Sequence, residues 1–514
     1  MTAQVDGETI EGSESGDSDS TSTSNRPPQS QATEGAVPAP TVNYGSSLTK
    51  AEPYGTETIP DAERHGHPRS QFTLWFAANM VLAVLVSGFF ASSLGLSIVQ
   101  GLTAVAVGSL AGCLVMGLLA SIGTRFGVPQ QVQARGPMGY FANFAPVALL
   151  TNVSAIGWVA VNTVFAVLAL QELFAIPFWI GSLILFVLQS LFAVWGHNLI
   201  HLVNKIATVV LALLFAVITV LALTEVEIGA ASEGSQGGEF SDWVTFSSFF
   251  FIYVMTWTPF ASDFSRYLPR NTSQKKIVAY TAVGGFLSLL WLGSIGVLVS
   301  SFAGDLGAVE AVAELTGSWA WLAMLTVVIS TIPVSAMNLY GGALSLLTIR
   351  VPVSRSVGVA ITAIISFGIT LLMQGDPYGS FYDFLSLLGY LVVPFTTVLL
   401  VDYFVRTRNR MPEAIAELEQ SHRGIAWGVI AWIAGCLVSA LFWTTPLGTG
   451  PFAPLIEDAG DVTYFIGAAT SVLVYLAIHA ARGKNSNIKL SFKNRRSTDT
   501  DSPEPTTKSH KETN

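Results

Sequence analysis

FFFIYVMTWTPFASDF, residues 249–264 of the chain, begins as an apolar membrane span and loses that character at Thr256, Thr258 and Pro259. Proline has no backbone N–H and clashes with the preceding helical turn, so we predict that the helix breaks here. A bilayer tolerates the exposed backbone of a broken helix only where it faces protein, water or a ligand. Discontinuous helices of this kind carry the substrate and ion sites of secondary transporters. We therefore expect a binding site at this break.

The composition of the chain is that of a membrane protein. Its 514 residues are 51% hydrophobic and 11% charged, whereas soluble domains carry roughly 25% charged residues. Cys113 and Cys436 both fall in apolar stretches, which predicts small core residues rather than a disulfide or a metal site. The N-terminus has no basic region followed by an apolar stretch, so we expect no cleavable signal peptide.

The two ends of the chain are polar. Residues 1–52 are rich in Ser, Thr, Gly, Glu and Asp, which predicts a disordered acidic tail. Residues 53–71 are a polar run-in to the first span, and residues 482–514 form a basic and polar tail.

Between the two ends the sequence predicts an all-α integral membrane protein. A spanning helix needs about 20 largely apolar residues, and twelve stretches qualify. Ten lie in a core at 72–404 and two at 424–481. Their approximate bounds are 72–94, 99–122, 146–171, 176–196, 203–224, 243–263, 277–302, 318–348, 357–374, 382–404, 424–443 and 461–481.

The distribution of charge predicts the orientation. All 25 Lys and Arg residues fall in the two termini, in alternate loops or at adjoining helix ends, and the other loops carry acidic residues without any base. The positive-inside rule then places both termini in the cytoplasm of a cell that carries this chain in its plasma membrane. One missed or surplus helix would destroy this partition, so it also supports the count of twelve.

On the third predicted helix, Trp158 and Asn162 are four residues apart and share one face near mid-span. In a structural interpretation, the indole packs against Gly157 and the amide bonds a neighbouring helix. In a functional one, the indole stacks on a ligand and the amide donates and accepts hydrogen bonds. Position alone leaves both interpretations open.

The eighth predicted helix has a polar stripe of Thr331, Ser335 and Asn338 at i, i+4 and i+7, with Pro333 loosening the backbone beside it. Ser and Thr in membrane helices often bond their own preceding turn, and we expect this of Ser330. Asn338 has no such easy local partner in this interpretation, which makes it the better candidate for ligand binding.

Three further features have a structural and a functional interpretation. Ser87-Gly88 is the predicted weak point of the first helix, although single glycines are frequent in membrane helices. Asp263 and Arg266, spaced i, i+3, are expected to form an ion pair rather than to carry protons. His197 and His201 are expected to lie on a solvated or lipid-facing helix face. We find no phosphate-binding loop or metal-ligand cluster in the sequence, so we expect neither an enzyme nor a metal or cofactor site.

Several short motifs, taken in order, resemble the nucleobase–cation symporter-1 family, and within it the purine–cytosine permease branch. The motifs are Gly55…Ile59-Pro60…Glu63-Arg64, Phe72-Thr73-Leu74-Trp75-Phe76-Ala77-Ala78-Asn79-Met80, Gly123…Gly127…Gln130…Arg135, Gly157-Trp158…Asn162, Trp257…Ala261-Ser262-Asp263-Phe264 and Asn338-Leu339-Tyr340.

The resemblance implies a leucine-transporter-type fold, in which helices 1–5 and 6–10 form inverted repeats, helices 1 and 6 are broken, and two helices are appended. It further implies that Trp158, Asn162, Trp257 and Asn338, with Ser335 nearby, line a nucleobase site. Indoles suit the faces of a planar base and amides suit its edge. Gly88, Ser330 and Thr331 are the candidates for the ion site. With the helix registered on Asn338, however, Pro333 and Val334 fall where sodium-binding hydroxyls are expected, so we favour a proton over sodium.

The sequence thus predicts a secondary active importer of cytosine or purines, coupled to H⁺ or Na⁺ by alternating access. Its expected partners are the nucleobase and the lipid bilayer, with no nucleic acid. One alternative is a symporter of the same fold for another small ring compound, such as allantoin, hydantoin or a vitamin-like solute. Another is a membrane receptor that does not transport. The oligomeric state is left open.

Overall fold

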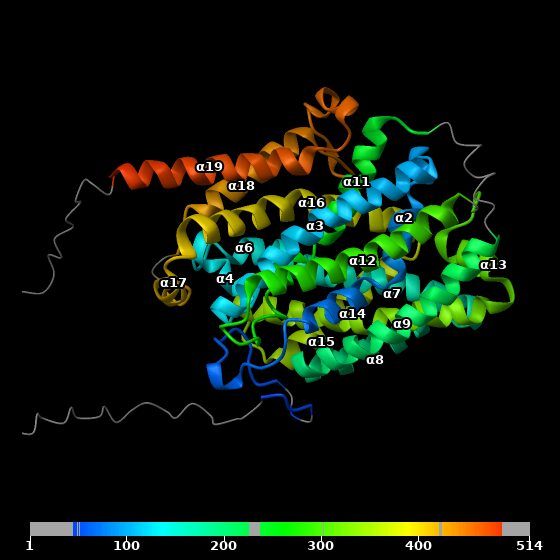
Figure 1. The fold of residues 1–514 in the computed structure, drawn as a ribbon, viewed down its shortest axis with the longest axis horizontal. Coiled ribbons are helices and arrows are strands. Elements are labelled where there is room, and N and C mark those ends of the chain that lie inside the picture. The colour runs from blue at the N-terminus through cyan, green and yellow to red at the C-terminus, as the bar shows by residue number, and fades with distance from the viewer. Residues whose placement is uncertain are drawn as a thin grey trace, which may run out of the picture. The chain divides into compact units, whose positions relative to one another are not determined.

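The computed structural model describes residues 45–48, 50, 52–225, 237–301, 303–420 and 424–485. Residues 44–514 belong to one compact unit, and the long helices of its described part run side by side (Figure 1). Most of the predicted N-terminal tail and nearly all of the C-terminal tail lie outside the described residues.

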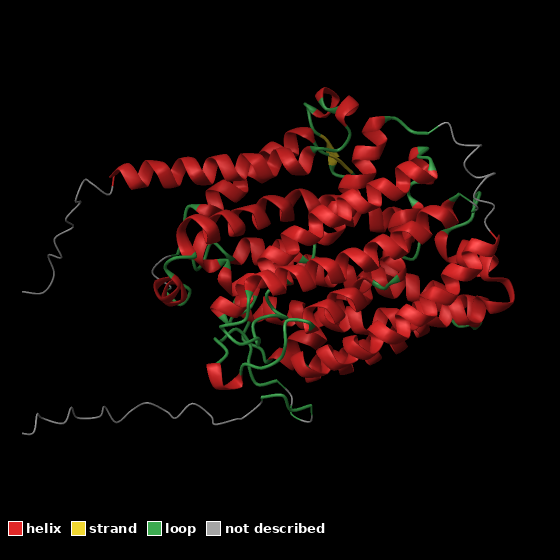
Figure 2. Ribbon diagram, viewed as in Figure 1, coloured by secondary structure: helices red, strands yellow, loops and turns green. Residues whose placement is uncertain are grey.

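Almost all regular structure in the described ranges is helical, with one short strand pair (Figure 2). The elements before the second break are η1 (Asp61–Glu63), α1 (Ser70–Asn79), α2 (Leu82–Phe89), η2 (Ser92–Leu94), α3 (Ile98–Phe126), α4 (Gln130–Gln133), α5 (Arg135–Met138), α6 (Phe144–Pro146), η3 (Val147–Asn152), α7 (Val153–Leu173), α8 (Phe178–Trp195) and α9 (His197–Glu225). Those that follow are α11 (Phe240–Met255), η4 (Thr258–Phe260), α12 (Gln274–Ser300), α13 (Ala308–Thr316), η5 (Gly317–Trp319), α14 (Ala320–Thr348), α15 (Arg355–Met373), α16 (Pro377–Asp402) and η6 (Tyr403–Thr407). The last are α17 (Met411–Glu417), α18 (Gly428–Phe442), β1 (Thr444–Thr445), β2 (Gly448–Thr449), η7 (Ala453–Leu455), η8 (Glu457–Ala459) and α19 (Thr463–Asn485).

Nine helical segments in the described ranges are long and apolar enough to cross a membrane, and the bent pair of α1 and α2 makes a tenth candidate. The apolar helix α18 is shorter than this criterion requires, and α11 has 16 residues before it reaches the predicted break. The chain is therefore a multi-pass membrane protein.

The helices pack in a pattern centred on α3, α7, α12 and α14. The most extensive contacts join α12 with α3, α11 with α3, and α14 with α7. The last two helices, α18 and α19, pack against each other and against α16 (Figure 1). One end of the bundle carries Arg135, Arg266 and Arg355 and is called the basic end. The opposite end carries Asp383 and Asp461 and is called the acidic end.

The break in the first span does not lie at Ser87-Gly88. It lies at Met80 and Val81, between α1 and α2, where the helix axis bends by 56°. Gly88 is helical and allows close packing instead, because a Cβ there would lie 2.2 Å from the carbonyl oxygen of Gly293 in α12. The prediction for the first break is therefore wrong. Gly88 allows α2 to pack closely against α12 and does not mark a point where the helix unwinds.

Described residues within the predicted tail pack against the bundle before its expected end at residue 52. The Asn198 side chain of α9 donates hydrogen bonds to the backbone carbonyls of Gly45 (3.0 Å) and Ser47 (2.8 Å). Glu52 is only 5% exposed. This segment has a composition typical of disorder. It nevertheless packs against the bundle, because residues far along the chain bind it.

The close contact of α2 with α12 makes a testable prediction. A Cβ on Gly296 would lie 2.0 Å from the backbone oxygen of Leu85, so Gly296→Ala should destabilise the protein by about 1–3 kcal/mol through overpacking. Thermal unfolding of the purified protein in detergent measures the effect. Gly368→Ala in α15 is the control, since a Cβ there meets nothing within 4 Å; equal melting temperatures for the two variants would contradict the assigned contact.

Candidate functional site

The break after α11 occurs at the position predicted from Pro259. α11 ends at Met255, Thr256 occupies its C-cap, and Pro259 lies in the first turn of η4. Proline suits this position because its missing N–H would have no helical partner in a first turn. From Ala261 to Tyr267 the chain continues in turns rather than in α-helix.

Side-chain hydroxyls satisfy the backbone carbonyls that the break exposes. Thr256 donates to the carbonyl of Tyr253 (2.7 Å), and Thr258 donates to that of Met255 (2.6 Å). Ser154 of α7 reaches the carbonyl of Thr256 at 3.4 Å. The Thr258 hydroxyl is also hydrogen-bonded to the hydroxyl of Thr396 in α16. These bonds meet the requirement that buried backbone groups have partners.

Trp257 links the break to the first span. Its ring packs edge-on against Trp75 of α1, with the ring centroids 5.4 Å apart, and its side chain is buried. The Trp75 indole donates to Gln71 (3.3 Å), and Gln71 donates to the carbonyl of Phe264 (2.9 Å). The sequence analysis did not select Gln71, Trp75 or Thr396 as individual site residues; only Trp75 lay within a family motif.

On α7, Trp158 and Asn162 have different surroundings. The indole of Trp158 donates to the Thr256 hydroxyl (2.9 Å), and its ring packs edge-on against Tyr253, Phe381 and Phe384. Asn162 is 1% exposed, and neither its amide nitrogen nor its amide oxygen has a hydrogen-bond partner. Among the described residues it is the only buried side-chain amide with both groups unpaired.

Helical spacing shows which way Asn162 faces. Ala155 lies against Gly342 of α14, and Val159 packs in a cluster with Ala336 and Leu339 of the same helix. Asn162 follows Ala155 and Val159 at i+7 and i+3, so it continues their row, on the side toward α14.

The stripe on α14 is fully buried and mostly bonded to its own helix. Ser330 and Thr331 donate to the carbonyls of Val327 (2.7 Å) and Val328 (2.8 Å). Asn338 donates to the carbonyl of Val334 (3.0 Å), so the expectation that it has no local partner is wrong. Its amide oxygen and the Ser335 hydroxyl have no partner.

Four of the five predicted substrate residues therefore carry a buried polar atom without a protein partner: Asn162, Trp257, Ser335 and Asn338. Leaving such an atom unpaired costs about 1–3 kcal/mol. The described residues contain other unpaired atoms, for example in Gln189 and Thr281, so the property is not confined to this site. These donors and acceptors lie on α7, α14 and the break.

Asp263 and Arg266 are both fully buried, but their hydrogen-bond partners lie elsewhere. Asp263 accepts from the Gln130 backbone N–H (2.8 Å) and the Gln131 amide (3.0 Å). Arg266 forms its ion pair with Glu52, at 2.8 Å. Burial and the adjacent Glu52 carboxylate raise the pKa of the Tyr267 phenol above its ordinary value, so the phenol stays protonated and donates to Glu52 (2.6 Å).

His197 does not lie on a solvated or lipid-facing surface, whereas His201 is partly exposed. His197 is 5% exposed and its ring lies 4.2 Å from that of Tyr267. His201 lies 4.4 Å from the His197 ring and is hydrogen-bonded to the carbonyl of Phe264. Within the described residues, no group of three or more His, Cys, Asp or Glu side chains could hold a metal ion.

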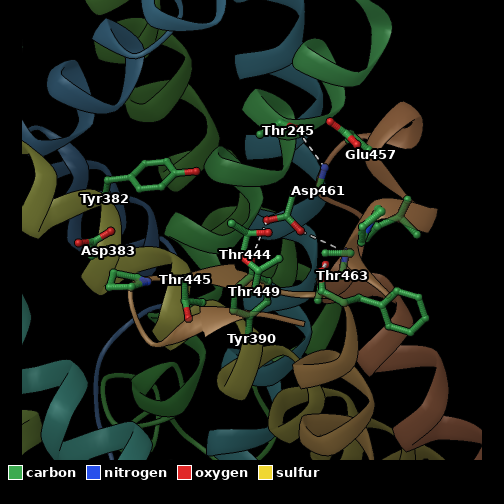
Figure 3. A pocket seen from close by; sticks show the side chains of 16 residues that line it. Thr245, Tyr382, Asp383, Tyr390, Thr444, Thr445, Thr449, Glu457, Asp461 and Thr463 are labelled. Carbon is green, nitrogen blue, oxygen red and sulfur yellow. Dashed lines mark hydrogen bonds between the residues drawn. The ribbon is translucent and has the colours of Figure 1, made fainter. Parts of the chain in front are cut away.

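The acidic end holds a separate cavity of about 630 Å³ (Figure 3). Tyr382 and Asp383 of α16 lie on one side of it, and the loop with Asp461 lies on the other. Tyr390 donates to the Asp461 carboxylate (2.9 Å), and Thr245 of α11 accepts from the Asp461 backbone N–H (2.9 Å). None of the predicted substrate residues lines this cavity.

A second cavity of about 310 Å³ shares Tyr382 and Asp461 with the first and extends to Phe249. Phe249 packs against Phe381, with the ring centroids 6.1 Å apart, and Phe381 packs against Trp158 at 5.9 Å. Aromatic side chains therefore connect the cavities with the region of the break.

Known proteins resemble the chain in sequence and in fold. The Bacillus subtilis protein YxlA, assigned by its name to the purine–cytosine permeases, is 27% identical over 447 residues, which cover 85% of this chain and 97% of that protein. The purine–cytosine permease fcyB of Emericella nidulans is 24% identical and covers 88% of this chain and 96% of its own length. The structure of Mhp1, a nucleobase–cation–symport-1 family transporter, in a closed conformation with bromovinylhydantoin bound, has a TM-score of 0.70 at 22% identity and covers 86% of this chain and 97% of that one.

The Mhp1 likeness confirms the fold at a coarse level, since that transporter has the same helical architecture. The predicted membership of the nucleobase–cation symporter-1 family is also confirmed. The family model for permeases of cytosine and purines, uracil, thiamine and allantoin matches residues 58–467, and the chain belongs to this family of permeases.

Proposed function

We propose that the protein is a secondary active importer of nucleobases, cytosine or purines, coupled to a cation by alternating access. Two of its relatives are named as purine–cytosine permeases. The observation that carries the proposal is the set of unpaired buried polar atoms on Asn162, Trp257, Ser335 and Asn338. A neutral base can pair with amide, hydroxyl and indole groups without a charged anchor.

The proposed site lies at the break, between α7, α14 and the first span. Trp158 and Trp257 flank the base, and the amides of Asn162 and Asn338 read its edge. The cavities at the acidic end serve as the entry route, because their aromatic lining leads to Trp158 through Phe381. A receptor that does not transport is disfavoured, since the relatives are permeases.

A ring compound other than a nucleobase is the second candidate. Mhp1 binds a hydantoin derivative in the structure that resembles this chain, and hydantoin, like cytosine, is a small ring with donors and acceptors on its edge. The unpaired polar atoms of Asn162 and Asn338 suit the edge of either compound, so competition in transport distinguishes the two candidates.

We also propose the finer topology: twelve spans in two inverted repeats, with α18 and α19 appended and both termini in the cytoplasm of the plasma membrane. The first repeat runs from α1 to α9 and the second from α11 to η6. Two pairs of equivalent helices, α3 with α12 and α7 with α14, are among the pairs with the most extensive contacts. A two-fold axis in the membrane plane that relates the repeats brings equivalent helices together in this way.

For the coupling ion we propose the proton. The hydroxyls of Ser330 and Thr331, which are the candidates for binding sodium, donate to carbonyls of their own helix. Pro333 and Val334, one turn further, have no hydroxyl. At the first break, the Ala77 carbonyl accepts from the Met80 N–H (3.1 Å), so this carbonyl is already engaged.

The first prediction from this proposal separates a binding role of Asn162 from a structural one. Asn162→Leu should leave the melting temperature of the ligand-free protein unchanged or raise it, because it removes two unpaired buried groups. The same change should reduce the affinity for cytosine by about tenfold or more, through the loss of two hydrogen bonds of roughly 1 kcal/mol each. Thermal unfolding and radiolabelled cytosine uptake measure the two effects.

Gln71→Leu is the matched control for stability. Gln71 is fully buried and both ends of its amide are bonded, so its loss should destabilise the protein by about 1–3 kcal/mol. If Asn162→Leu lowers the melting temperature as much as Gln71→Leu does, Asn162 is structural.

A second prediction concerns the ion. In cells without their own nucleobase carriers, cytosine uptake should persist when choline replaces sodium, should collapse with a protonophore, and should increase as the external pH falls. Ser330→Ala and Thr331→Val should retain this pattern. Uptake that depends on sodium and is lost in these two variants would assign the ion site to their hydroxyls. Uptake of hydantoin or allantoin without competition by any nucleobase would contradict the proposed nucleobase substrate. It would leave the assignment of the fold unchanged.

A further inference from the structure

Glu52 precedes the first membrane helix, yet its carboxylate is fully buried. One oxygen accepts from Arg266 (2.8 Å), Tyr267 (2.6 Å) and Tyr340 (3.0 Å). The other accepts from the backbone N–H of His197 (3.1 Å). Four donors therefore converge on one carboxylate, and hydrogen bonds to an ionised group are about twice as strong as neutral ones.

These donors belong to different parts of the bundle. Arg266 and Tyr267 end the chain segment that follows the break, Tyr340 lies on α14, and His197 begins α9. The backbone carbonyl of Glu52 also accepts from Arg355 at the start of α15 (3.2 Å). A single residue of the N-terminal segment therefore connects both halves of the bundle at the basic end.

The segment around Glu52 crosses the basic end as a strap, which we define as the described residues 45–48, 50 and 52–65. Besides Glu52 and the Asn198 contacts, the Gly55 carbonyl accepts from Arg266 (2.7 Å). The Ile59 N–H donates to Gly127 (2.9 Å), and Arg64 donates to the carbonyl of Thr124 (2.6 Å) at the end of α3. The strap therefore extends from α9 to α3 over the end of the broken segment.

The packing below the strap is incomplete. A cavity of about 170 Å³ lies between the strap residues Ser46, Leu48 and His65, the α9 residues His197 and His201, and Phe264. The Asn198 bonds to Gly45 and Ser47 hold the strap on one side of this cavity. Beyond it, the Glu52 bonds and a small apolar cluster of Ile59, Tyr54 and Tyr267 hold the strap against the bundle. Such a contact can separate without disrupting the hydrophobic core.

Arg266 is nine residues after Trp257, and the segment between them has no α-helix. Phe264 of this segment contacts both Trp75 and Tyr340. The segment thus links the proposed substrate site directly to the partners of Glu52. Conversely, the Glu52 contacts restrain the segment.

We propose that the strap is a latch on the cytoplasmic side, in which Glu52 bonded to Arg266, Tyr267 and Tyr340 holds the inward pathway closed. Opening toward the cytoplasm separates Glu52 from these donors and lets water reach the broken segment from the basic end. The proposal rests on the alternating access of the proposed function, and it adds a gating residue that precedes the region matched by the family model.

Thiol labelling tests the latch without knowledge of the substrate. Ser345 is buried, its hydroxyl has no hydrogen-bond partner, and it follows Asn338 and Gly341 on the same face of α14, toward the basic end. Ser345→Cys in a Cys113→Ala, Cys436→Ala background is the reporter. Its reaction with a membrane-impermeant maleimide is followed in inside-out vesicles, with and without Glu52→Gln. The neutral amide weakens the contacts to Arg266 and Tyr267, and we expect labelling to be about tenfold faster, as for a shift of roughly 1.4 kcal/mol toward the open state.

Asp61→Asn is the matched control. Asp61 belongs to the same strap and pairs with Arg270, but its side chain is 68% exposed, so labelling should not change. Tyr340→Phe removes one of the four bonds and should give a smaller increase than Glu52→Gln. Gel filtration confirms that each variant folds.

Unchanged labelling in both Glu52→Gln and Tyr340→Phe would overturn the latch, whatever the substrate. Faster labelling in a protein that carries no nucleobase would support the latch and overturn the proposed substrate. Equal acceleration by Asp61→Asn would show a general loosening of the strap, and would also overturn the specific role of Glu52.

Discussion

The structure depends on one constraint: a broken helix inside a bilayer must find partners for its backbone. At the break after α11, the hydroxyls of Thr256, Thr258 and Ser154 satisfy carbonyls that a continuous helix would have used. The Trp158 indole in turn donates to Thr256. These bonds require α7 and α16 to lie against the break, so the arrangement of helices around the site follows from the chemistry of the break.

Two kinds of polar residue are buried along the same segment. The Trp257 indole has no protein partner, and neither do polar atoms of Asn162, Ser335 and Asn338 on α7 and α14. These are the groups of the proposed substrate site. Around Arg266, by contrast, the carboxylate of Glu52 is saturated with donors. Breaking a buried ion pair by removing one partner is strongly unfavourable, so the ion pair holds this end of the segment, whereas the other end belongs to the proposed substrate site. Nine residues without α-helix join the two ends, which is a short physical connection between the proposed substrate site and the proposed latch.

The sequence predicted the features that depend on local chemistry. Pro259 predicted the second break correctly, because a missing backbone N–H removes a hydrogen bond within the same helical turn. The apolar stretches also followed from local composition, and within the described residues nine helices, with the bent pair as a tenth candidate, are long and apolar enough to cross a membrane. The first break was placed wrongly, because Met80 and Val81 have no local signal, whereas Gly88 is explained only by its contact with α12.

Glu52 could not be found from the sequence for a related reason. The residues around Glu52 have a composition typical of a disordered tail, and its ion-pair partner Arg266 is 214 positions away. Asp263, which is three residues from Arg266, was the obvious partner, but the α4 turn binds its carboxylate instead. Local spacing predicts which residues share a helix face, whereas long-range pairs require the packed fold.

An experimental structure of the purified protein with cytosine would test the central claim most directly. The account predicts the ring at the break, beside Trp257, with its edge within hydrogen-bonding distance of the Asn162 amide. A ring bound instead in the cavity beside Tyr382 and Asp461, with Asn162 still unpaired, would contradict it.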